Sequence, residues 1–246
     1  MSVDACADLV RRGDPDRFRA AMAAKPRTRA VLFPIYAFNL EIARAPWVTS
    51  EPLLAEMRLQ WWRDALEEIA AGGRVRRHEV ATPLSEAVDA EGARILGEVV
   101  DARRWEIENR PFSDQLEFYR HLTGTAGSLM WAAARSLGAT DEDEVRGTGY
   151  AGGLAAWFVA VPALLARNRE PLFDDSLRSI RGLAQDGLTH IHRVSRPARP
   201  AALAAWEARP ILKAAIRDPR RVYEGRLERA PGIRNLRLAR MALLGV

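Results

Sequence analysis

The sequence predicts an all-α protein, a single bundle of packed helices, and two observations lead to this prediction. Apolar residues recur at helical spacing along most of the chain, whereas no segment shows the sustained alternation of apolar and polar residues that strands would. Prolines fall mostly between the periodic segments, where they separate helices: Pro26, Pro83, Pro111, Pro171 and Pro219. The linker-like stretch at residues 196–200 is too short to divide the chain, so we expect one domain over residues 1–246.

Residues 52–71 show the helical pattern most clearly. The apolar side chains of this segment share one face, which we expect to be buried: Leu59, Trp62, Leu66 and Ile69. The acidic side chains lie on the opposite face, which we expect to be solvated and paired with Arg63 and its neighbours: Asp64, Glu67 and Glu68. Gly72 and Gly73 then end the helix.

Capping residues and breaks in the periodicity place the other helices. A short helix from Phe18 steps at Pro26 into the next one, and Ser113 is a candidate N-cap. Thr140 and Asp143 resemble a capping box, which predicts that another helix begins beside them. The remaining helices are expected over residues 84–107, 113–137, 172–194 and 201–216, with a C-terminal segment from Ile233.

Residues 147–166 contain no charged residue, so a membrane-spanning helix has to be considered. The segment is rich in glycine and alanine and holds Pro162, which makes it weakly hydrophobic for lipid and suited to close packing. We therefore expect a buried helix at the centre of the bundle. The Gly-x-Gly-x-x-Gly match at residues 147–152 lacks the preceding strand that a dinucleotide site needs, so we discard it.

The charge is concentrated near the C-terminus. The 37 basic and 32 acidic residues give a net charge of +5, and every basic residue except Lys25 and Lys213 is an arginine. Residues 209–246 carry ten basic and three acidic residues, whereas the rest of the chain has a net charge of −2. This basic C-terminal segment suits the phosphates of a lipid, a nucleic acid or a diphosphate ligand, or is simply an arginine-rich solvated surface.

Several classes of partner and site are disfavoured. The basic segment holds one aromatic residue, Tyr223, and no nucleic-acid-binding motif, so we expect no nucleic acid partner. Cys6 is the single cysteine, which rules out an internal disulfide framework and a cysteine-based zinc site. His190 and His192 would point to opposite sides of a helix, so we expect no metal there. The N-terminal residues have no apolar signal core, which indicates a cytoplasmic location.

Four patches are distinctive in their order and spacing: residues 18–29, Tyr-Ala-Phe-Asn-Leu-Glu-Ile-Ala at 36–43, Arg-Leu-Gln-Trp-Trp-Arg-Asp at 58–64 and Tyr-Arg-His-Leu-Thr-Gly-Thr-Ala-Gly at 119–127. Together they resemble the squalene/phytoene synthase family of head-to-head prenyl transferases. The resemblance extends from Phe18 to the start of the basic segment. It implies an isoprenoid-synthase-like helical bundle around a central cavity, which agrees with the independent prediction of an all-α fold.

Members of that family ionise an allylic diphosphate with Mg²⁺, a hard ion that prefers carboxylate oxygens, and carry two aspartate-rich motifs on facing helices. The three acidic positions of the first motif correspond here to Ala43, Arg44 and Trp47. The Gln, Asn and Asp positions of the second correspond to Trp157, Ala160 and Leu164. The resemblance therefore implies that the magnesium ligands are lost, and we expect no catalytic residue, no metal ligand and no cofactor.

The resemblance also suggests side chains that would line the prenyl cavity or bind an anion. Candidates for cavity or ligand contact are Tyr36, Phe38, Asn39, Trp61, Trp62, Tyr119, Thr123 and Trp157. Candidates for binding a diphosphate or another anion are Arg27, Arg29, Arg44 and Arg58. Aromatic residues at helical spacing are more often plain core filling, and this alternative stays open for the tryptophans.

Three functions are compatible with these observations. Residues 37–43, 48–51 and 58–62 are similar to the branch of the family that contains a mitochondrial respiratory complex I assembly factor. That similarity implies a non-catalytic protein on the inner face of the cytoplasmic membrane. Its partners would be anionic lipids, respiratory-complex subunits or assembly proteins, and its cavity would hold an isoprenoid or lipid. The alternative is an active prenyl transferase that condenses farnesyl or geranylgeranyl diphosphate head to head with Mg²⁺. A third is an isoprenoid-binding or scaffold protein unrelated to respiration.

Overall fold

A computed structural model describes residues 2–49, 51–73, 75–108, 110–228 and 230–244. The elements of its N-terminal half are α1 (Val3–Gly13), α2 (Pro15–Ala23), η1 (Pro26–Thr28), α3 (Arg29–Arg44), η2 (Ala45–Trp47), α4 (Pro52–Ala70), α5 (Ala81–Ala87), α6 (Ala90–Arg103) and α7 (Trp105–Glu108). The rest are α8 (Gln115–Leu122), η3 (Thr123–Gly127), α9 (Ser128–Arg135), α10 (Glu142–Leu165), α11 (Leu177–Thr189), α12 (Arg199–Ala202), η4 (Leu203–Ala205), α13 (Ala208–Arg217), α14 (Arg220–Tyr223) and α15 (Pro231–Leu244).

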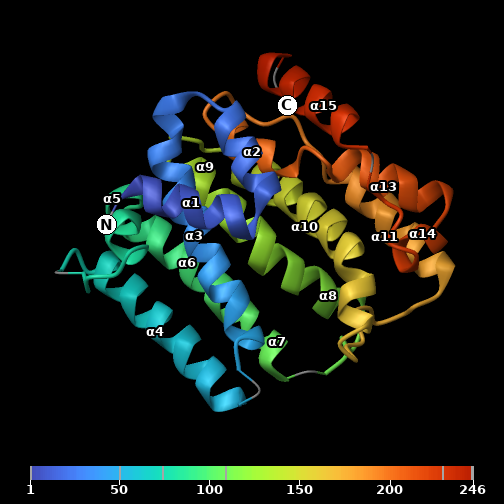
Figure 1. Cartoon of the computed structure of the whole chain (residues 1–246), viewed down its shortest axis with the longest axis horizontal. Coiled ribbons are helices and arrows are strands. Elements are labelled where there is room, and N and C mark those ends of the chain that lie inside the picture. The colour runs from blue at the N-terminus through green and yellow to red at the C-terminus, as the bar shows by residue number, and fades with distance from the viewer. Residues whose placement is uncertain (1, 50, 74, 109, 229, 245–246) are drawn as a thin grey trace.

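The described part of the chain contains helices and no strand, so the predicted all-α fold is confirmed. In Figure 1, α10 runs through the middle of the bundle, with α3, α4 and α6 on one side and α11, α13 and α14 on the other. The apolar face predicted for residues 52–71 is buried in α4, as expected: Leu59, Trp62, Leu66 and Ile69. The acidic face forms ion pairs at the surface, Glu67 with Arg63 and Glu68 with Arg76.

Several predicted boundaries are wrong, and each error has a local cause. The helix expected over residues 84–107 is divided, because Asp89 caps a new helix by accepting a hydrogen bond from the Gly92 amide. Pro83 lies inside α5 rather than between helices, in the first turn, where a missing amide hydrogen costs nothing. Asp114, not Ser113, caps α8 by accepting from the Glu117 amide.

The start of α10 shows how a distant contact overrides a capping signal. The helix begins at Glu142 with Asp141 in the cap position, so the predicted capping box of Thr140 and Asp143 does not form. The Asp141 carboxylate instead accepts hydrogen bonds from the backbone amide and the hydroxyl of Ser195, at 2.6 and 2.5 Å. These bonds hold the pKa of Asp141 below its ordinary value, against the opposing effect of burial.

Glycines allow α10 to lie unusually close to η3, which is a π-helical turn. A Cβ atom on Gly149 would lie 2.8 Å from the carbonyl oxygen of Ala126, and one on Gly153 would lie 2.6 Å from the Ala126 Cβ. By length and composition α10 qualifies as a candidate membrane span. In the bundle, Leu154 and Phe158 on its inner face are buried in the core.

Arg234 links the C-terminal helix α15 to the bundle through ion pairs. The Arg234 side chain forms ion pairs with Asp16, with Glu207 at 3.2 Å and with Glu228 at 2.9 Å, and its guanidinium lies 5.3 Å from the centre of the Trp206 ring. Only 12% of this side chain is exposed. Three carboxylates therefore converge on one positive charge, which offsets their mutual repulsion.

We predict that Arg234→Ala lowers the free energy of unfolding by about 2–3 kcal/mol, because three carboxylates then face one another with no cation between them. Arg240→Ala is the matched control on the same helix, since Arg240 is exposed and makes no ion pair with a described residue. Urea denaturation measures both variants, and equal stability of the two would contradict the role given to Arg234.

Candidate ligand-binding cavity along α10

Two adjoining cavities lie between α10 and the elements α2, α3 and η3. The cavity nearer the start of α10, here called the upper cavity, has a volume of about 180 Å³. The cavity nearer the end of α10, here called the lower cavity, has a volume of about 360 Å³. Both are lined by Arg17, Ala126, Gly153 and Ala156, so the two spaces meet beside the middle of the helix. Small side chains create this space, because a glycine or an alanine leaves room that a larger residue would fill.

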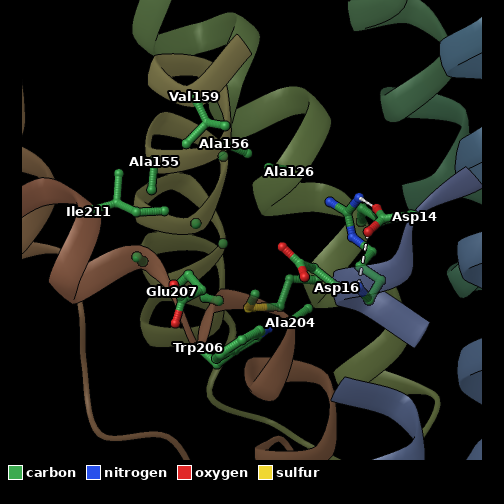
Figure 2. Close-up of a pocket in the computed structure, with 18 of the residues that line it drawn as sticks. Asp14, Asp16, Ala126, Ala155, Ala156, Val159, Ala204, Trp206, Glu207 and Ile211 are labelled. Carbon is green, nitrogen blue, oxygen red and sulfur yellow. Dashed lines mark hydrogen bonds and ion pairs between the residues drawn. The ribbon is translucent and has the colours of Figure 1, made fainter. Parts of the chain in front are cut away.

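The upper cavity has an apolar wall and an acidic rim. Figure 2 shows the wall formed by Ala126, Ala155, Ala156, Val159, Ala204, Trp206 and Ile211. The carboxylates of Asp14, Asp16 and Glu207 lie at its edge. Asp16 and Glu207 are ion-paired with Arg234, so the protein partly offsets the charge of the acidic rim.

Arg17 on α2 and Tyr36 on α3 are polar residues that line the upper cavity. The Asp14 carboxylate accepts hydrogen bonds from the Arg17 backbone amide at 2.9 Å and from its guanidinium at 2.5 Å. Burial opposes the charge of Arg17, but Asp14 holds the pKa of this guanidinium above its ordinary value. Burial raises the pKa of Tyr36, so this side chain stays a neutral phenol whose hydroxyl has no hydrogen-bond partner among the described residues.

The lower cavity is rich in arginine. Five arginines line it: Arg17, Arg103, Arg110, Arg167 and Arg169. Its acidic lining residues are Glu106 and Glu170. Arg17 is ion-paired with Asp14, and Arg103 with Glu106. Arg110 is ion-paired with both Glu108 and Glu117.

The last two arginines lie over a single tryptophan at the edge of the cavity. The guanidinium carbons of Arg167 and Arg169 are 4.9 and 5.0 Å from the centre of the Trp47 ring, distances at which a cation is attracted to an aromatic face. Arg169 also donates a hydrogen bond to the Glu106 carbonyl oxygen at 3.0 Å. Neither arginine forms an ion pair with an acid in the described ranges, although Glu106 acts electrostatically on Arg169 and Glu170 also lines the cavity.

Glu106 is the buried acid of the lower cavity. Its carboxylate accepts a hydrogen bond from Arg103 at 2.5 Å, and Nε2 of His121 lies 3.5 Å from the same oxygen. Burial disfavours its charge, but Arg103 and His121 together hold the pKa of Glu106 below its ordinary value. The carboxylate is therefore ionised at neutral pH and committed to an internal ion pair.

Positions of the two motifs named by the resemblance converge on this lower cavity. Ala43 and Trp47, from the first motif, line one side of it, and Trp157, Ala160 and Leu164, from the second, line another. Arg44 is exposed, with its guanidinium beside Gly13 and not in the lining. The two helices thus face each other as they would in an enzyme, but with apolar side chains in place of the ligands.

These residues do not fit a magnesium centre. Mg²⁺ needs several oxygen ligands close together, and carboxylates usually supply them. Within the described ranges, no group of three or more histidine, cysteine, aspartate or glutamate side chains could hold a metal ion. Glu106 is engaged by Arg103, and the surrounding charge is positive.

Some of the candidates for cavity contact lie at the cavities and others lie in the core. Tyr36 lines the upper cavity and Trp157 the lower one, where its indole donates to the Pro171 carbonyl at 2.8 Å. Asn39 lines neither cavity, and its side-chain oxygen accepts a 3.4 Å hydrogen bond from Arg103, which lines the lower cavity. Phe38 and Trp62 pack edge to face in the core, 5.3 Å apart.

The remaining aromatic and hydroxyl candidates also lie outside both linings. Trp61 packs against His78 at 4.9 Å and under Arg76 at 5.0 Å, on the outer side of α4. Tyr119 packs on Tyr150, with ring centres 4.7 Å apart. Thr123 begins the π-helical turn, and its hydroxyl has no hydrogen-bond partner among the described residues.

The candidate anion-binding arginines do not gather at one place. Arg29 donates a hydrogen bond to the Met22 carbonyl at 2.7 Å, and Arg58 lies exposed on α4. Arg27 lines a separate cleft beside α15. The arginines that line the lower cavity were not among the predicted candidates: Arg17, Arg103, Arg110, Arg167 and Arg169. Of these, only Arg167 and Arg169 could have been found from the sequence, because they come directly after the uncharged segment at residues 147–166.

Comparison with known proteins defines the class of this fold. The family model for squalene/phytoene synthase matches residues 10–161. The chain therefore belongs to the squalene/phytoene synthase family. A crystal structure of a dehydrosqualene synthase in complex with ligand superposes with a TM-score of 0.74 over 98% of this chain and 95% of that one. The sequence identity is 12%, so this likeness establishes the fold alone.

Curated relatives share a narrower similarity. Human NADH dehydrogenase (ubiquinone) complex I assembly factor 6 is 26% identical over 138 residues, which is 55% of this chain and 41% of that protein. The homolog from Drosophila melanogaster is 25% identical over 190 residues, 74% of this chain and 57% of that protein. The chain thus matches about half the length of these relatives, and the predicted kinship with the assembly-factor branch is confirmed as a distant one.

The Arg103–Glu106 pair predicts an acid-dependent stability. Because the pKa of Glu106 is lowered on folding, its contribution is complete above its ordinary value of 4.5 and is lost as the pH falls through that value toward the lowered one. We expect Glu106→Gln to be about 2–4 kcal/mol less stable at neutral pH, with the difference shrinking on acidification. Urea midpoints from neutral pH to about pH 3.5 measure this. A difference that stays constant with pH would contradict the assignment.

Proposed function

We propose that this protein binds an isoprenoid or lipid in the cavity along α10 without transferring a prenyl group, and that it acts at the inner membrane face in assembling a respiratory complex. The observation that carries the first part is that apolar residues line the cavity at motif positions: Ala43 and Trp47 stand at acidic positions of the first motif, and Ala160 and Leu164 at the Asn and Asp positions of the second. The distant similarity to complex I assembly factors supports the second part.

The cavity has the two chemical ends that an amphiphile requires. Its upper part is walled by alanines, Val159 and Ile211, which suit a hydrocarbon chain. Its lower edge carries the cations of Arg167 and Arg169, which form no ion pair with an acid among the described residues and suit an anionic head group. An arginine can hold such a group, but it does not supply the clustered divalent charge that expels a diphosphate in this family.

The membrane part of the proposal is supported by charge and by kinship. A basic C-terminal segment would be attracted to the anionic lipids of an inner leaflet. The relatives are described as assembly factors for complex I, whose subunits are therefore the partners to test.

Ala156→Leu tests the cavity directly, because Ala156 lines both spaces and a leucine there would obstruct their junction. We expect native purification followed by mass spectrometry to find a co-isolated isoprenoid or lipid with the wild type, and about tenfold less of it with the variant. Ala166→Leu is the matched control, since Ala166 ends the same helix, is exposed and lines neither space. Equal occupancy in both variants, or an empty wild type, would overturn ligand binding in this cavity.

A separate assay tests the absence of prenyl transfer. Wild-type protein with Mg²⁺ and either farnesyl or geranylgeranyl diphosphate should release no diphosphate above the rate without protein, because the described residues include no cluster of carboxylates that could hold the metal. Release that depends on both protein and Mg²⁺ would instead support the alternative of an active prenyl transferase.

A further inference from the structure

A further cleft of different character lies beside the C-terminal helix α15, next to the end of α2 and the residues that follow α9. Its volume is about 820 Å³. The end of α2 and η1 form one wall, residues 196–203 a second, and the last turn of α15 a third. Because it is separate from the cavities along α10, the proposed ligand site does not account for it.

Four cations line this cleft: Lys25, Arg27, Arg196 and Arg199. No acidic residue is among its lining residues, and none of the four forms an ion pair within the part of the chain that is described. Nε of Arg199 is buried without a hydrogen-bond partner there. Many other arginines of the protein are paired with a carboxylate, so this concentration of unpaired positive charge favours an anion with several oxygen acceptors.

An exposed apolar stripe adjoins the cleft. Ile233, Leu236 and Leu243 occupy one face of α15 and are 55%, 74% and 84% exposed. Leu238 on the opposite face is buried against the bundle, so α15 is amphipathic with its second apolar face uncovered. Leu243 also lines the cleft, which makes the stripe continuous with the cationic site.

We infer that this end of the molecule is a docking surface for an anionic phospholipid bilayer. The cleft cations would receive a lipid phosphate, while the outer leucines of α15 enter the boundary between head groups and acyl chains. A soluble phosphate compound would satisfy the cations equally, but it would leave the apolar stripe without a role. The inference rests on the membrane location in the proposed function and identifies the surface that provides it.

Vesicle flotation tests this surface with the full chain. Vesicles of phosphatidylcholine mixed with phosphatidylglycerol should bind the wild type, and vesicles of phosphatidylcholine alone should bind it much more weakly. Removing two exposed cleft cations in Arg27→Gln with Arg196→Gln should weaken binding to the mixed vesicles about 20-fold. The matched control, Arg120→Gln with Arg178→Gln, removes the same charge from exposed sites on α8 and α11 and should change binding less than about threefold.

A second pair of variants separates the lipid surface from a site for soluble anions. Leu236→Ser with Leu243→Ser keeps every cation but should weaken binding to the mixed vesicles about tenfold, because the exposed leucines no longer enter the bilayer. No loss in this variant, together with full displacement of vesicles by inorganic phosphate, would overturn the lipid assignment.

The remaining outcomes distinguish this inference from the proposed function. If the wild type floats and the cleft and control variants float equally well, the docking surface is wrong while the membrane location stands. If the wild type does not float with the mixed vesicles, both the docking surface and the membrane location fail. Ligand in the α10 cavity is read independently by mass spectrometry in either case.

Discussion

The close contact between α10 and the π-helical turn η3 is the constraint on which the rest of the bundle depends. Gly149 and Gly153 allow the two backbones to approach to distances that any side chain would prevent. This contact fixes the central helix, and the glycines and alanines beside it leave open space next to the contact, where Ala126 and Gly153 line both cavities. Core packing and the ligand cavity therefore have one physical origin, the run of small residues in α10.

The lower cavity is lined by arginines and by cation–aromatic contacts. Where a prenyl transferase of this family holds carboxylates, Trp47 lies under Arg167 and Arg169. The buried carboxylate of the lower cavity is internally paired with Arg103. Positive charge supplied by fixed side chains can retain an anion at rest, whereas clustered Mg²⁺ also stabilises a departing diphosphate. The family fold and this lining are the basis of the proposal that the protein binds a ligand without turnover.

Periodicity along the sequence was sufficient to predict the fold class and the buried face of α4, because both follow from local spacing. It predicted where α10 begins but not how that start is held, since Asp141 bonds Ser195 from a distant segment. The same limit applies to the site. Tyr36 and Trp157 could be found from the family resemblance, but Arg103 and Glu106 acquire their role only by pairing beside the cavity. Arg27 matched an anion-binding pattern and lies at a different cleft.

The most direct test of the central claim is the binding of Mn²⁺, a paramagnetic substitute for Mg²⁺, in the presence of farnesyl diphosphate. Electron paramagnetic resonance reports free Mn²⁺ by its six-line signal. The account predicts that adding the protein leaves that signal at the level set by the diphosphate alone. A protein-dependent loss of the signal at stoichiometric concentrations would show a metal centre in the cavity and contradict the account.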